Sequence, residues 1–516
     1  MQRALTGTKG WRMVASPVAS TYSDMFKSPL VTQGFTGSSF PTLQPNLLWW
    51  LESDGGTTLQ SWRKPTNLTD NLTSGQGYFH YLFNGAGRLN ANGTPSGSNY
   101  TDVLPTTMSV TGVDPFNGTG TYDYNLTYTT KASTQTPSPT DTIYYDLNSL
   151  DQGWNFIGNP TASTLDWDAT GWTKTSLDNT IYIWDPSALS GNGDYLTWNG
   201  TTGTLGSGKI APFQAFMVHA TDDNTLSFTN AVKSRTVGTF LRSSSTAETI
   251  TLPLTLSYGK LQTTSFITFS QNGVTGPDRW DAYRLEPMSD TWLSLYTLSS
   301  PSTVSPLVIN NLPMPEEDMI DIPLYCNSQI NDGTKGDYML QWTLPENWPS
   351  GWKISLQDHR SELIYSMTEN TRYAFNTTSG DTLSATLNTL PLPKKMVNCL
   401  TNNSLLRSTA SLPPFSIVIS KGSDIEYIAP KAQLVGNYPN PFNVQTTVRF
   451  SLPAKAKVRV EVLTLQGVRI ATLADGTYSA GITEVKWNAK GDAPGLYFIK
   501  FISGETVETK KALIIN

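Results

Sequence analysis

The feature that most limits the fold of this chain is the alternation of its apolar and polar residues. Runs such as residues 251–256 and 458–462 place apolar side chains two positions apart, which is the period of a β-strand with one buried face. The i, i+3, i+4 spacing of an amphipathic helix is hard to find. Gly, Pro, Ser, Thr and Asn separate the runs, as they do where polar turns join short strands. The sequence therefore predicts an all-β fold of tandem β-sandwich modules.

A degenerate repeat divides the N-terminal half of the chain. Residues 10–17 (GWRMVASP) recur in outline as residues 153–160 (GWNFIGNP), a Gly-Trp turn followed by an apolar strand that a proline ends. Two further apolar segments follow each copy in the same order, and this order predicts two related β-units. These segments are LLWW (47–50) and GQGYFHYL (75–82) after the first copy, and IYIW (181–184) and PFQAFMV (212–218) after the second.

The length and the polar connections predict four domains. The chain has 516 residues, whereas a single domain has roughly 100 to 200. Stretches poor in apolar residues at 131–141, 234–249 and 421–433 are the expected links. The predicted units are a β-sandwich at 1–135, its second copy at 140–235, a second type of β-sandwich at 250–425, and a seven-stranded immunoglobulin-like domain at 434–516.

Charge and hydropathy exclude two kinds of partner. The chain has 35 Lys+Arg against 41 Asp+Glu, for a net charge of −6, and no basic stripe, so we expect no nucleic-acid binding. No run approaches the roughly 18 consecutive apolar residues of a membrane-spanning helix, so no transmembrane segment is predicted. The first 30 residues lack the pattern of a signal peptide, and we expect residue 1 to lie within a longer precursor.

The last eighty or so residues have the clearest strand pattern. Seven short runs follow Leu434, and the segments around Gly467 and Gly476 are predicted hairpin turns, because glycine accepts a positive φ. The opening segment NYPNPFN cannot form a central strand, because its two prolines remove hydrogen-bond donors.

These residues resemble a known family. The segments NYPNPFNVQTTVRFSLP, VRVEVLTLQGVRIATL, GITEVKWNAKGDAPGLYFIKF and TKKALIIN closely resemble the type A C-terminal sorting domain of type IX secretion system cargo in Bacteroidetes and Chlorobi. The chain departs from the family pattern at its extreme end, where Asn516 replaces the usual basic residue. The matching motif positions are Asn437, Pro439, Asn440, Pro441, Phe442, Asn443, Gly467, Trp487, Gly495, Tyr497, Lys510 and Lys511.

The resemblance implies an export route. It implies passage to the periplasm, translocation by the type IX outer-membrane translocon, and a final location at the outer-membrane surface or outside the cell. Attachment to a lipopolysaccharide anchor commonly follows in this family.

Acid–base and nucleophilic chemistry lack their usual parts. His80 and His219 lie at what the repeat predicts to be corresponding places beside aromatic residues, which favours structural roles, and His359 lies in a predicted turn. No Gly-x-Ser-x-Gly elbow is present, and neither cysteine has a neighbouring histidine. We therefore predict no catalytic residues, no enzymatic activity and no cofactor.

Carboxylates and cysteines offer weaker candidates. Asp166 and Asp168 should share one strand face, but solvated loop charge explains them better than a glycosidase pair, as it also explains residues 316–318. The Asp-rich loop 185–194 lacks the ligand alternation of a calcium loop, and neither cysteine has metal-ligand spacing, so no metal site is predicted. Cys326 and Cys399 lie in one predicted domain and could pair as a disulfide or remain thiols.

Two short patterns resemble O-glycan attachment sites. The segments DTI and DTL place Thr142 and Thr382 at the attachment position, although such patterns arise often by chance.

Aromatic residues leave the function open. A group of tryptophans exceeds what one small core needs and would suit sugar faces if exposed, although half or more are expected in cores. The leading hypothesis is a secreted, non-enzymatic structural or adhesive surface protein. The alternatives are carbohydrate-binding modules that recognise surface glycans, and a subunit that assembles with copies of itself. The tryptophans are Trp49, Trp50, Trp62, Trp167, Trp172, Trp184 and Trp198.

Overall fold

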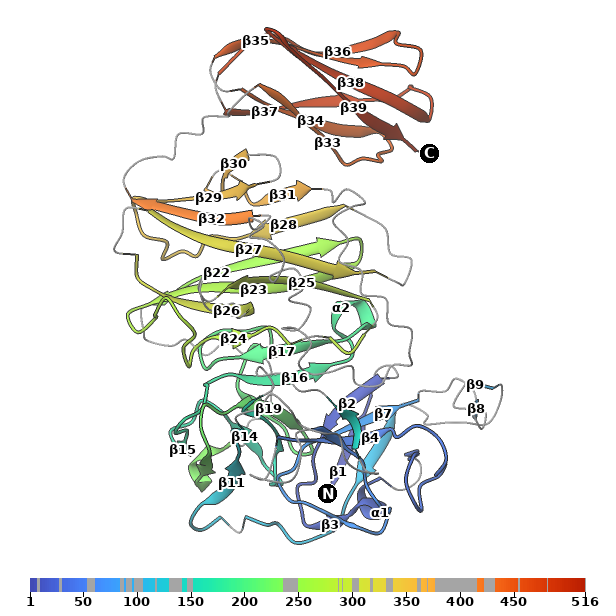
Figure 1. Ribbon diagram of the computed structural model, residues 1–516, viewed down its shortest axis with the longest axis vertical. Helices are drawn as coiled ribbons and strands as arrows, with labels where there is room; N and C mark the ends of the chain where they lie inside the picture. The colour runs from blue at the N-terminus through green and yellow to red at the C-terminus, as the bar shows by residue number, and fades with distance from the viewer. Residues whose placement is uncertain are drawn as a thin grey trace.

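The regular secondary structure in the computed structural model of the chain is almost all β-strand, so the all-β prediction is confirmed (Figure 1). The described helices are α1 (Tyr22–Met25), α2 (Ala188–Gly191) and the 3₁₀ turn η2 (Asn230–Val232), and none of them has the length and apolar character to cross a membrane. The structure describes residues 1–6, 10–26, 30–52, 61–83, 88–89, 95–96, 105–116, 118–129, 142–145, 152–234, 249–285, 287–289, 291–298, 306–315, 319–330, 337–359, 363–368, 370–375, 415–421, 432–452, 455–479 and 481–515.

The two copies of the repeat form sheets with the same strand order. In both sheets the strand that begins with Gly-Trp lies at one edge. Next to it is the strand of the GQGYFHYL or PFQAFMV segment, then the strand of the LLWW or IYIW segment, and then the strand that follows that segment in sequence. The first sheet runs β2 (Gly10–Val14), β7 (Tyr78–Leu82), β4 (Leu47–Leu51), β5 (Ser61–Arg63), with β12 (Thr142–Tyr145) added at its edge. The second runs β13 (Trp154–Gly158), β19 (Ala215–His219), β16 (Ile181–Asp185), β17 (Asp194–Trp198).

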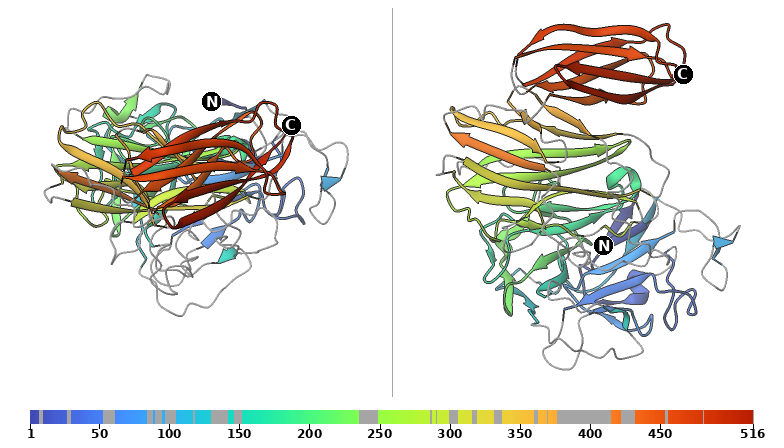
Figure 2. Two further views of the ribbon diagram at one scale, coloured as in Figure 1. Left: turned by 90° about the horizontal axis from the view of Figure 1, so that it is seen from above. Right: turned by 45° about the horizontal axis from the view of Figure 1, so that its top comes forward.

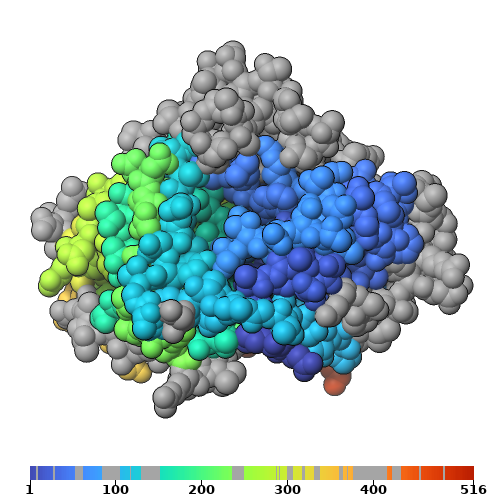
Figure 3. Space-filling view, turned by 90° about the horizontal axis from the view of Figure 1, so that it is seen from below, coloured from blue at the N-terminus to red at the C-terminus, as the bar shows by residue number. Residues whose placement is uncertain are grey.

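The two sheets hold each other by reciprocal contacts. Gln76 Nε2 donates a hydrogen bond to the carbonyl oxygen of Phe156 at 2.8 Å, and Gln214 Nε2 donates one to the carbonyl oxygen of Met13 at 3.0 Å. Met13 and Phe156 occupy the same position in the two copies, three residues after the glycine that opens each repeat. Each copy therefore uses the same glutamine to bind the same strand of the other, and Figure 3 shows the two copies side by side.

Strands also cross between the copies. The strand β11 (Tyr122–Leu126), near the end of the first predicted unit, pairs with β20 (Asn224–Phe228) of the second. The strand β12, near the start of the second predicted unit, pairs with β5 of the first. One hydrophobic core accordingly contains residues of both copies, among them Phe79 and Phe156, whose ring centroids are 4.9 Å apart.

Short strands complete these two units. The strand β20 also pairs with β15 (Trp172–Thr173). The remaining pairs and triplets are β1 (Gln2–Leu5) with β10 (Thr106–Ser109), β3 (Ser20–Thr21) with β6 (Asn71–Leu72), β8 (Arg88–Leu89) with β9 (Pro95–Ser96), and β18 (Lys209–Ile210) with β14 (Thr164–Asp166) and β21 (Lys233–Ser234).

The next sheet has 11 strands and folds over on itself around a second core. Its two ends meet, since Tyr373 in the last strand packs against Phe415 near the other end, with ring centroids 6.3 Å apart. In spatial order the strands are β30 (Leu363–Ser366), β29 (Trp352–Asp358), β32 (Phe415–Lys421), β27 (Met319–Gln329), β25 (Trp292–Leu298), β26 (Pro306–Pro313), β23 (Leu261–Ser270), β22 (Ile250–Tyr258), β28 (Tyr338–Trp342) and β31 (Arg372–Phe375), with β24 (Ala282–Tyr283) paired to β26.

The C-terminal segment contains the seven predicted strands in two sheets, at one end of the molecule (Figure 2). The three-stranded sheet is β33 (Gln433–Tyr438), β34 (Gln445–Leu452), β37 (Gly481–Asn488), and the four-stranded sheet is β36 (Arg469–Tyr478), β35 (Ala456–Leu463), β38 (Gly495–Ser503), β39 (Thr506–Ile514). The apolar residues spaced two apart, such as Val458, Val460 and Val462, are fully buried between the sheets.

One turn prediction in this segment is wrong. Gly467 has a φ of +80° in the turn between β35 and β36, as predicted. Gly476 instead lies within β36, opposite Val458. Register shifts in this hairpin lengthen β36 past the expected turn. The four domain boundaries and the immunoglobulin-like topology stay predictions.

Candidate functional site

The predicted sorting motif ties the start of the C-terminal segment to its last strand. The side chain of Asn440 donates a hydrogen bond to the carbonyl oxygen of Lys511 at 2.9 Å and accepts one from the N–H of Leu513 at 2.8 Å. The backbone N–H of Phe442 donates a hydrogen bond to the carbonyl oxygen of Leu513 in β39, and its carbonyl oxygen accepts one from the N–H of Ile515, just after β39. Asn440 makes its contacts from outside any strand, and Phe442 forms an isolated parallel bridge with Ile514, so the motif holds β39 in place without adding a full strand to the sheet.

Aromatic motif residues form the centre of the same core. Trp487 is 1% exposed, and its ring centroid lies 5.0 Å from that of Phe442 and 5.6 Å from that of Tyr497. The Tyr497 hydroxyl donates a hydrogen bond to the carbonyl oxygen of Ala493 at 2.8 Å. A tyrosine that bonds a backbone group just upstream of its strand is the tyrosine corner of immunoglobulin-like sandwiches, which supports that prediction.

The two motif lysines have different surroundings. Lys510 Nζ donates a hydrogen bond to the carbonyl oxygen of Val435 at 3.0 Å, so it faces the three-stranded sheet. Lys511 alternates with it along β39 and points away from that sheet. The sequence motif placed the two lysines together, but their positions in β39 direct them to opposite faces of the strand. The remaining motif residues, Asn437, Pro439, Pro441, Asn443 and Gly495, are also described.

A second candidate site lies where the large sheet meets the second copy of the repeat. The segment 277–285, which includes β24 of the large sheet, packs against the core of the repeat units. Thr180 donates a hydrogen bond to the carbonyl oxygen of Asp281 at 2.6 Å, and the backbone N–H of Tyr283 donates one to the Tyr182 hydroxyl at 2.8 Å. These contacts fix the two parts against each other.

A buried ion pair joins the same two parts. Arg284 Nη1 lies 3.3 Å from Asp194 Oδ1, and both side chains are almost fully buried. Arg284 Nε also donates a hydrogen bond to Ser294 Oγ at 2.7 Å. Burial raises the pKa of Asp194, while the charge of Arg284 opposes that shift.

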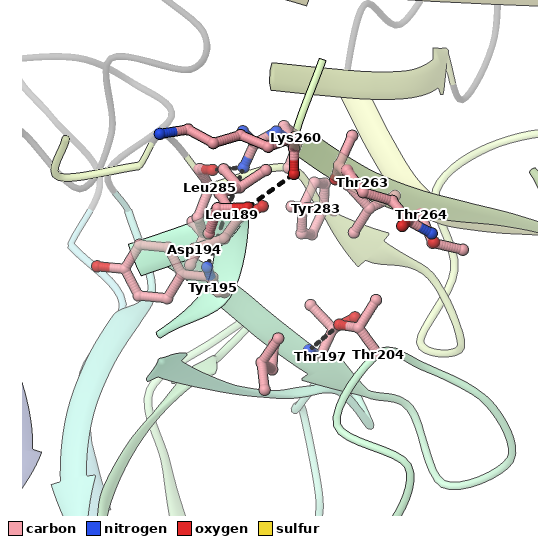
Figure 4. Close-up of a pocket in the computed structure, with 16 residues that line it drawn as sticks. Leu189, Asp194, Tyr195, Thr197, Thr204, Lys260, Thr263, Thr264, Tyr283 and Leu285 are labelled. Atoms are coloured by element: carbon pink, nitrogen blue, oxygen red, sulfur yellow. Dashed lines mark hydrogen bonds and ion pairs between the residues drawn. The ribbon is translucent and has the colours of Figure 1, made fainter. Parts of the chain in front are cut away.

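Two cavities open at this junction. The first encloses about 390 Å³ between α2 and β17 on one side and the hairpin of β22 and β23 on the other (Figure 4). It is bordered by Asp194 and Arg284 and by Lys260, Thr263 and Thr264. The second encloses about 330 Å³ and is lined by Lys174, Asp178, Asp278, Arg279 and Tyr283, among others.

Two groups at or beside the second cavity have strongly displaced pKa values. Burial, with a further contribution from the charge of Asp278, raises the pKa of Asp281, beside this cavity, to about 8. Burial lowers the pKa of Lys174 to about 7. Lys174 Nζ lies 3.9 Å from the centroid of the Trp167 ring. Their charged forms are disfavoured because the junction excludes water. The sequence did not point to Lys174, Asp281 or Arg284, because their partners are remote in the chain.

The two histidines of the repeat units do not occupy corresponding positions, contrary to the prediction. In the first copy Trp11 lies opposite Tyr81, whereas in the second copy its counterpart Trp154 lies opposite His219. His80 therefore corresponds to Val218. The sequence comparison misplaced the histidines by one residue, and a shift of one residue reverses the face of a strand.

Each histidine has a defined partner. The His80 ring is 1% exposed and its Nε2 lies 2.9 Å from the carbonyl oxygen of Val31; burial lowers its pKa to about 4. His219 Nδ1 lies 2.6 Å from Asp178 Oδ2 beside the second cavity. His359 Nε2 lies 2.9 Å from Ser416 Oγ.

The tryptophans are turned inward. All fifteen lie in the described residues, and each is buried or half-buried. Of the seven named as candidate sugar platforms, Trp49 and Trp172 are half-buried and the other five are at most 5% exposed. Flat exposed indole faces are thus lacking.

The predicted carboxylate pair is divided between two contacts. Asp166 ends β14 and forms an ion pair with Lys209, whereas Asp168 lies in the following turn and accepts a hydrogen bond from Trp198 Nε1 at 2.9 Å. The two therefore do not share a strand face as expected. Among the described residues, no three His, Cys, Asp or Glu side chains gather as metal ligands would.

Some predictions fall wholly or partly outside the described residues. Residues 316–318, Cys399 and Thr382 lie outside them. Cys326 lies in β27 opposite Leu295, and Thr142 lies in β12 opposite Arg63. The disulfide and the glycan sites stay predictions.

Comparison with known proteins identifies both parts of the chain. Residues 11–384 match the family described as Domain of unknown function (DUF8693), a match that runs across the three predicted units before the C-terminal segment. Residues 437–516 match the Secretion system C-terminal sorting domain. No curated protein matches the chain.

The second match agrees with the resemblance that the motif residues indicated and with the contacts that these residues make with β39. It shows that the chain is cargo of the type IX secretion machinery, with which its tail interacts, and that it is exported to the cell surface or the extracellular space. The chain belongs to the DUF8693 family and carries a C-terminal type IX sorting domain.

Proposed function

We propose that the region of residues 11–384, here called the front region, is a non-enzymatic structural or adhesive module that the sorting domain delivers to the cell exterior. The observation that carries this proposal is the continuous packing of the front region. A single core contains residues of both repeat copies together with Ala282 and Ile309 of the large sheet and Leu285, which follows β24. Such a core favours a rigid body that presents or spaces a surface.

The placement of the acid–base groups supports the proposal. His80 is enclosed, and the Asp194 carboxylate is paired with Arg284. His219 and Asp178 beside the second cavity are the described groups that most resemble a catalytic pair. The His219 ring is packed between Trp154 and Tyr283, with centroids 5.0 and 5.2 Å away, which suits a structural role.

A complementation experiment tests this proposal. A strain that lacks the gene should lose adhesion or integrity of its surface layer, and the wild-type gene should restore it. The double variant Asp178→Asn/His219→Gln should restore it equally, because the proposed role needs no proton transfer. Asp222→Asn, an exposed carboxylate nearby, is the matched control. If the double variant is exported and melts like the wild type but fails to complement, the non-enzymatic proposal is wrong.

The carbohydrate-binding alternative has less support. It depended on exposed indole faces, and the described tryptophans are at least half-buried. A glycan array with the purified front region tests it directly. Retention of a sugar that survives Trp172→Ala would locate binding elsewhere, for example in the polar cavity bordered by Lys260 and Thr263.

A further inference from the structure

The sorting domain carries most of the strongly exposed large hydrophobic side chains among the described residues. Eight of the eleven strongly exposed large hydrophobic side chains lie within residues 444–515. Monomeric proteins rarely leave contiguous apolar surface open without a use. The three that lie elsewhere, Met1, Val113 and Val274, are far apart in the sequence.

One face of the sorting domain already has a neighbour. Arg449 on the three-stranded sheet lies with its guanidinium carbon 5.7 Å from the centroid of the Tyr365 ring in β30. Asp337, which precedes β28, lies against the backbone N–H of Asn440. The three-stranded sheet therefore faces the front region, as Figures 1 and 2 show.

In the part of the chain that the structure describes, the front region does not cover the opposite face, on β38 and β39 (Figure 1). Tyr497, Ile499 and Phe501 of β38 point into the core, so the residues between them point outward. The register pairs Leu496 with Leu513 at one end of this outer surface and Ile502 with Val507 at the other.

Basic residues lie between these two apolar pairs. Lys511 lies opposite Phe498, and Lys500 lies opposite Thr509. Val507 is 56% exposed, Leu513 38% and Leu496 36%. We call the surface formed by Leu496, Lys500, Val507, Lys511 and Leu513 the open face.

We propose that the secretion machinery recognises the sorting domain through this open face. This inference rests on the sorting function assigned above and adds which surface of the domain the secretion machinery contacts. The partner should be a protein with a complementary apolar patch and nearby carboxylates, because aliphatic pairs gain free energy when water leaves them and lysines steer acidic partners. The face remains available while the front region is folded, because the front region packs on the other sheet.

The sorting motif has a defined part in this arrangement. Asn440 and Phe442 bind the backbone of β39, which carries Val507, Lys511 and Leu513. The motif is thus a positioning element for the open face, and it makes its contacts from the edge of the domain.

An export assay on the full chain, in a host that possesses the machinery, tests the proposal. Val507→Glu/Lys511→Glu should reduce the exported fraction at least about tenfold, with accumulation in the periplasm, because it replaces an apolar contact and a favourable charge by two carboxylates that repel an acidic partner. Val444→Glu/Lys490→Glu is the matched control. Val444 is 51% exposed and Lys490 is exposed, and neither lies on the open face.

The outcomes separate this inference from the sorting function. Wild-type export of the Val507/Lys511 variant, or equal loss in the control, would overturn the open face. Export of a chain that ends at residue 436 would overturn the sorting function itself. Melting temperatures of the purified variants should stay within a few degrees of wild type; if Val507→Glu/Lys511→Glu unfolds the domain, Val507→Ser/Lys511→Gln gives the same comparison with smaller changes.

Two other occupants are tested with the same variants. Wild-type protein should not bind vesicles of phosphatidylethanolamine and phosphatidylglycerol, and it should sediment as a monomer. Vesicle binding or dimerisation that the Val507/Lys511 variant abolishes would overturn the proposal, because lipid or a second copy would then occupy the face.

Discussion

In the front region the large side chains point inward, with Trp62, Trp167 and Phe216 fully buried, whereas in the sorting domain Val507, Leu465 and Val468 stand more than half exposed. Both regions are built from β-strands, but they differ in whether their large apolar side chains are buried or exposed. The front region closes its surfaces by packing one unit on another. The sorting domain keeps a compact core and leaves apolar side chains for a partner. The contrast suggests that the same β-architecture serves a rigid body in one case and a recognised label in the other.

The largest effect should come from Trp487→Ala in the sorting domain. Loss of this core residue should cost about 3 to 5 kcal/mol and lower the melting temperature of this small domain by roughly 15 °C or more. Export should fail, because the domain that is read no longer folds. Differential scanning calorimetry should show an unchanged melting temperature for the front region. A shift of both transitions would mean that the two regions unfold as one unit.

The converse substitution is Trp62→Ala in the front region. Trp62 contacts Trp50, Phe79 and, in the second copy, Phe156, so its loss should cost about 3 to 5 kcal/mol. The front transition should fall by roughly 10 °C while the sorting-domain transition stays. Trp280→Ala, at a half-buried loop position, is the control and should have little effect.

Arg284→Met should weaken the junction within the front region. The substitution leaves the Asp194 carboxylate buried without its counter-charge, at a cost of about 3 kcal/mol. Urea unfolding followed by tryptophan fluorescence should show the loss, and Arg284→Met/Asp194→Asn should recover part of it. Lys260→Met, at the exposed border of the same cavity, should leave the midpoint unchanged. Equal effects of the two single substitutions would argue against the ion pair.

The junction should also respond to pH through Asp281. Its folded pKa is raised to about 8 from 3.8, so the folded state retains a proton that the unfolded state releases. This contribution to stability is present below pH 3.8 and is lost as the pH rises toward 8. His80, with its folded pKa lowered to about 4 from 6.5, acts in the opposite direction: it stabilises above pH 6.5 and loses that contribution as the pH falls.

The difference between wild type and Asp281→Asn isolates the first effect. The variant should gain in relative melting temperature of the front region as the pH is raised from 5 to 8. The sorting-domain transition should be identical in the two proteins at every pH. A constant difference would show that Asp281 does not titrate in this window.

The smallest effect should come from Arg449→Ala at the contact between the two regions. Tyr365 is 6% exposed and the Arg449 side chain, which also pairs with Glu484, is 13% exposed. Loss of this largely desolvated cation–π contact should cost about 1 to 2 kcal/mol, so the sorting-domain transition should fall by several degrees. Arg459→Ala, which breaks an exposed ion pair with Asp475 away from this contact, gives the comparison. A large shift of both transitions in Arg449→Ala alone would show tight coupling.

Local pattern determined the strands, because burial of one face requires apolar residues at alternate positions. The buried Val458, Val460 and Val462 were predicted on that basis, and the motif from Asn437 to Asn443 identified the sorting domain. The repeat was also readable, because the same order of segments produced the same order of strands.

Contacts between remote residues could be decided only by the tertiary structure. The pairing of Arg284 with Asp194, the crossing of β11 and β12 between the copies, and the burial of the tryptophans depend on which strands become neighbours. The separation of Lys510 from Lys511 depends on register, because adjacent residues of a strand face opposite sides. The alternation of apolar and polar residues predicts that one face of a strand will be buried. Only the packed structure determines which neighbouring element covers that face and which faces stay exposed.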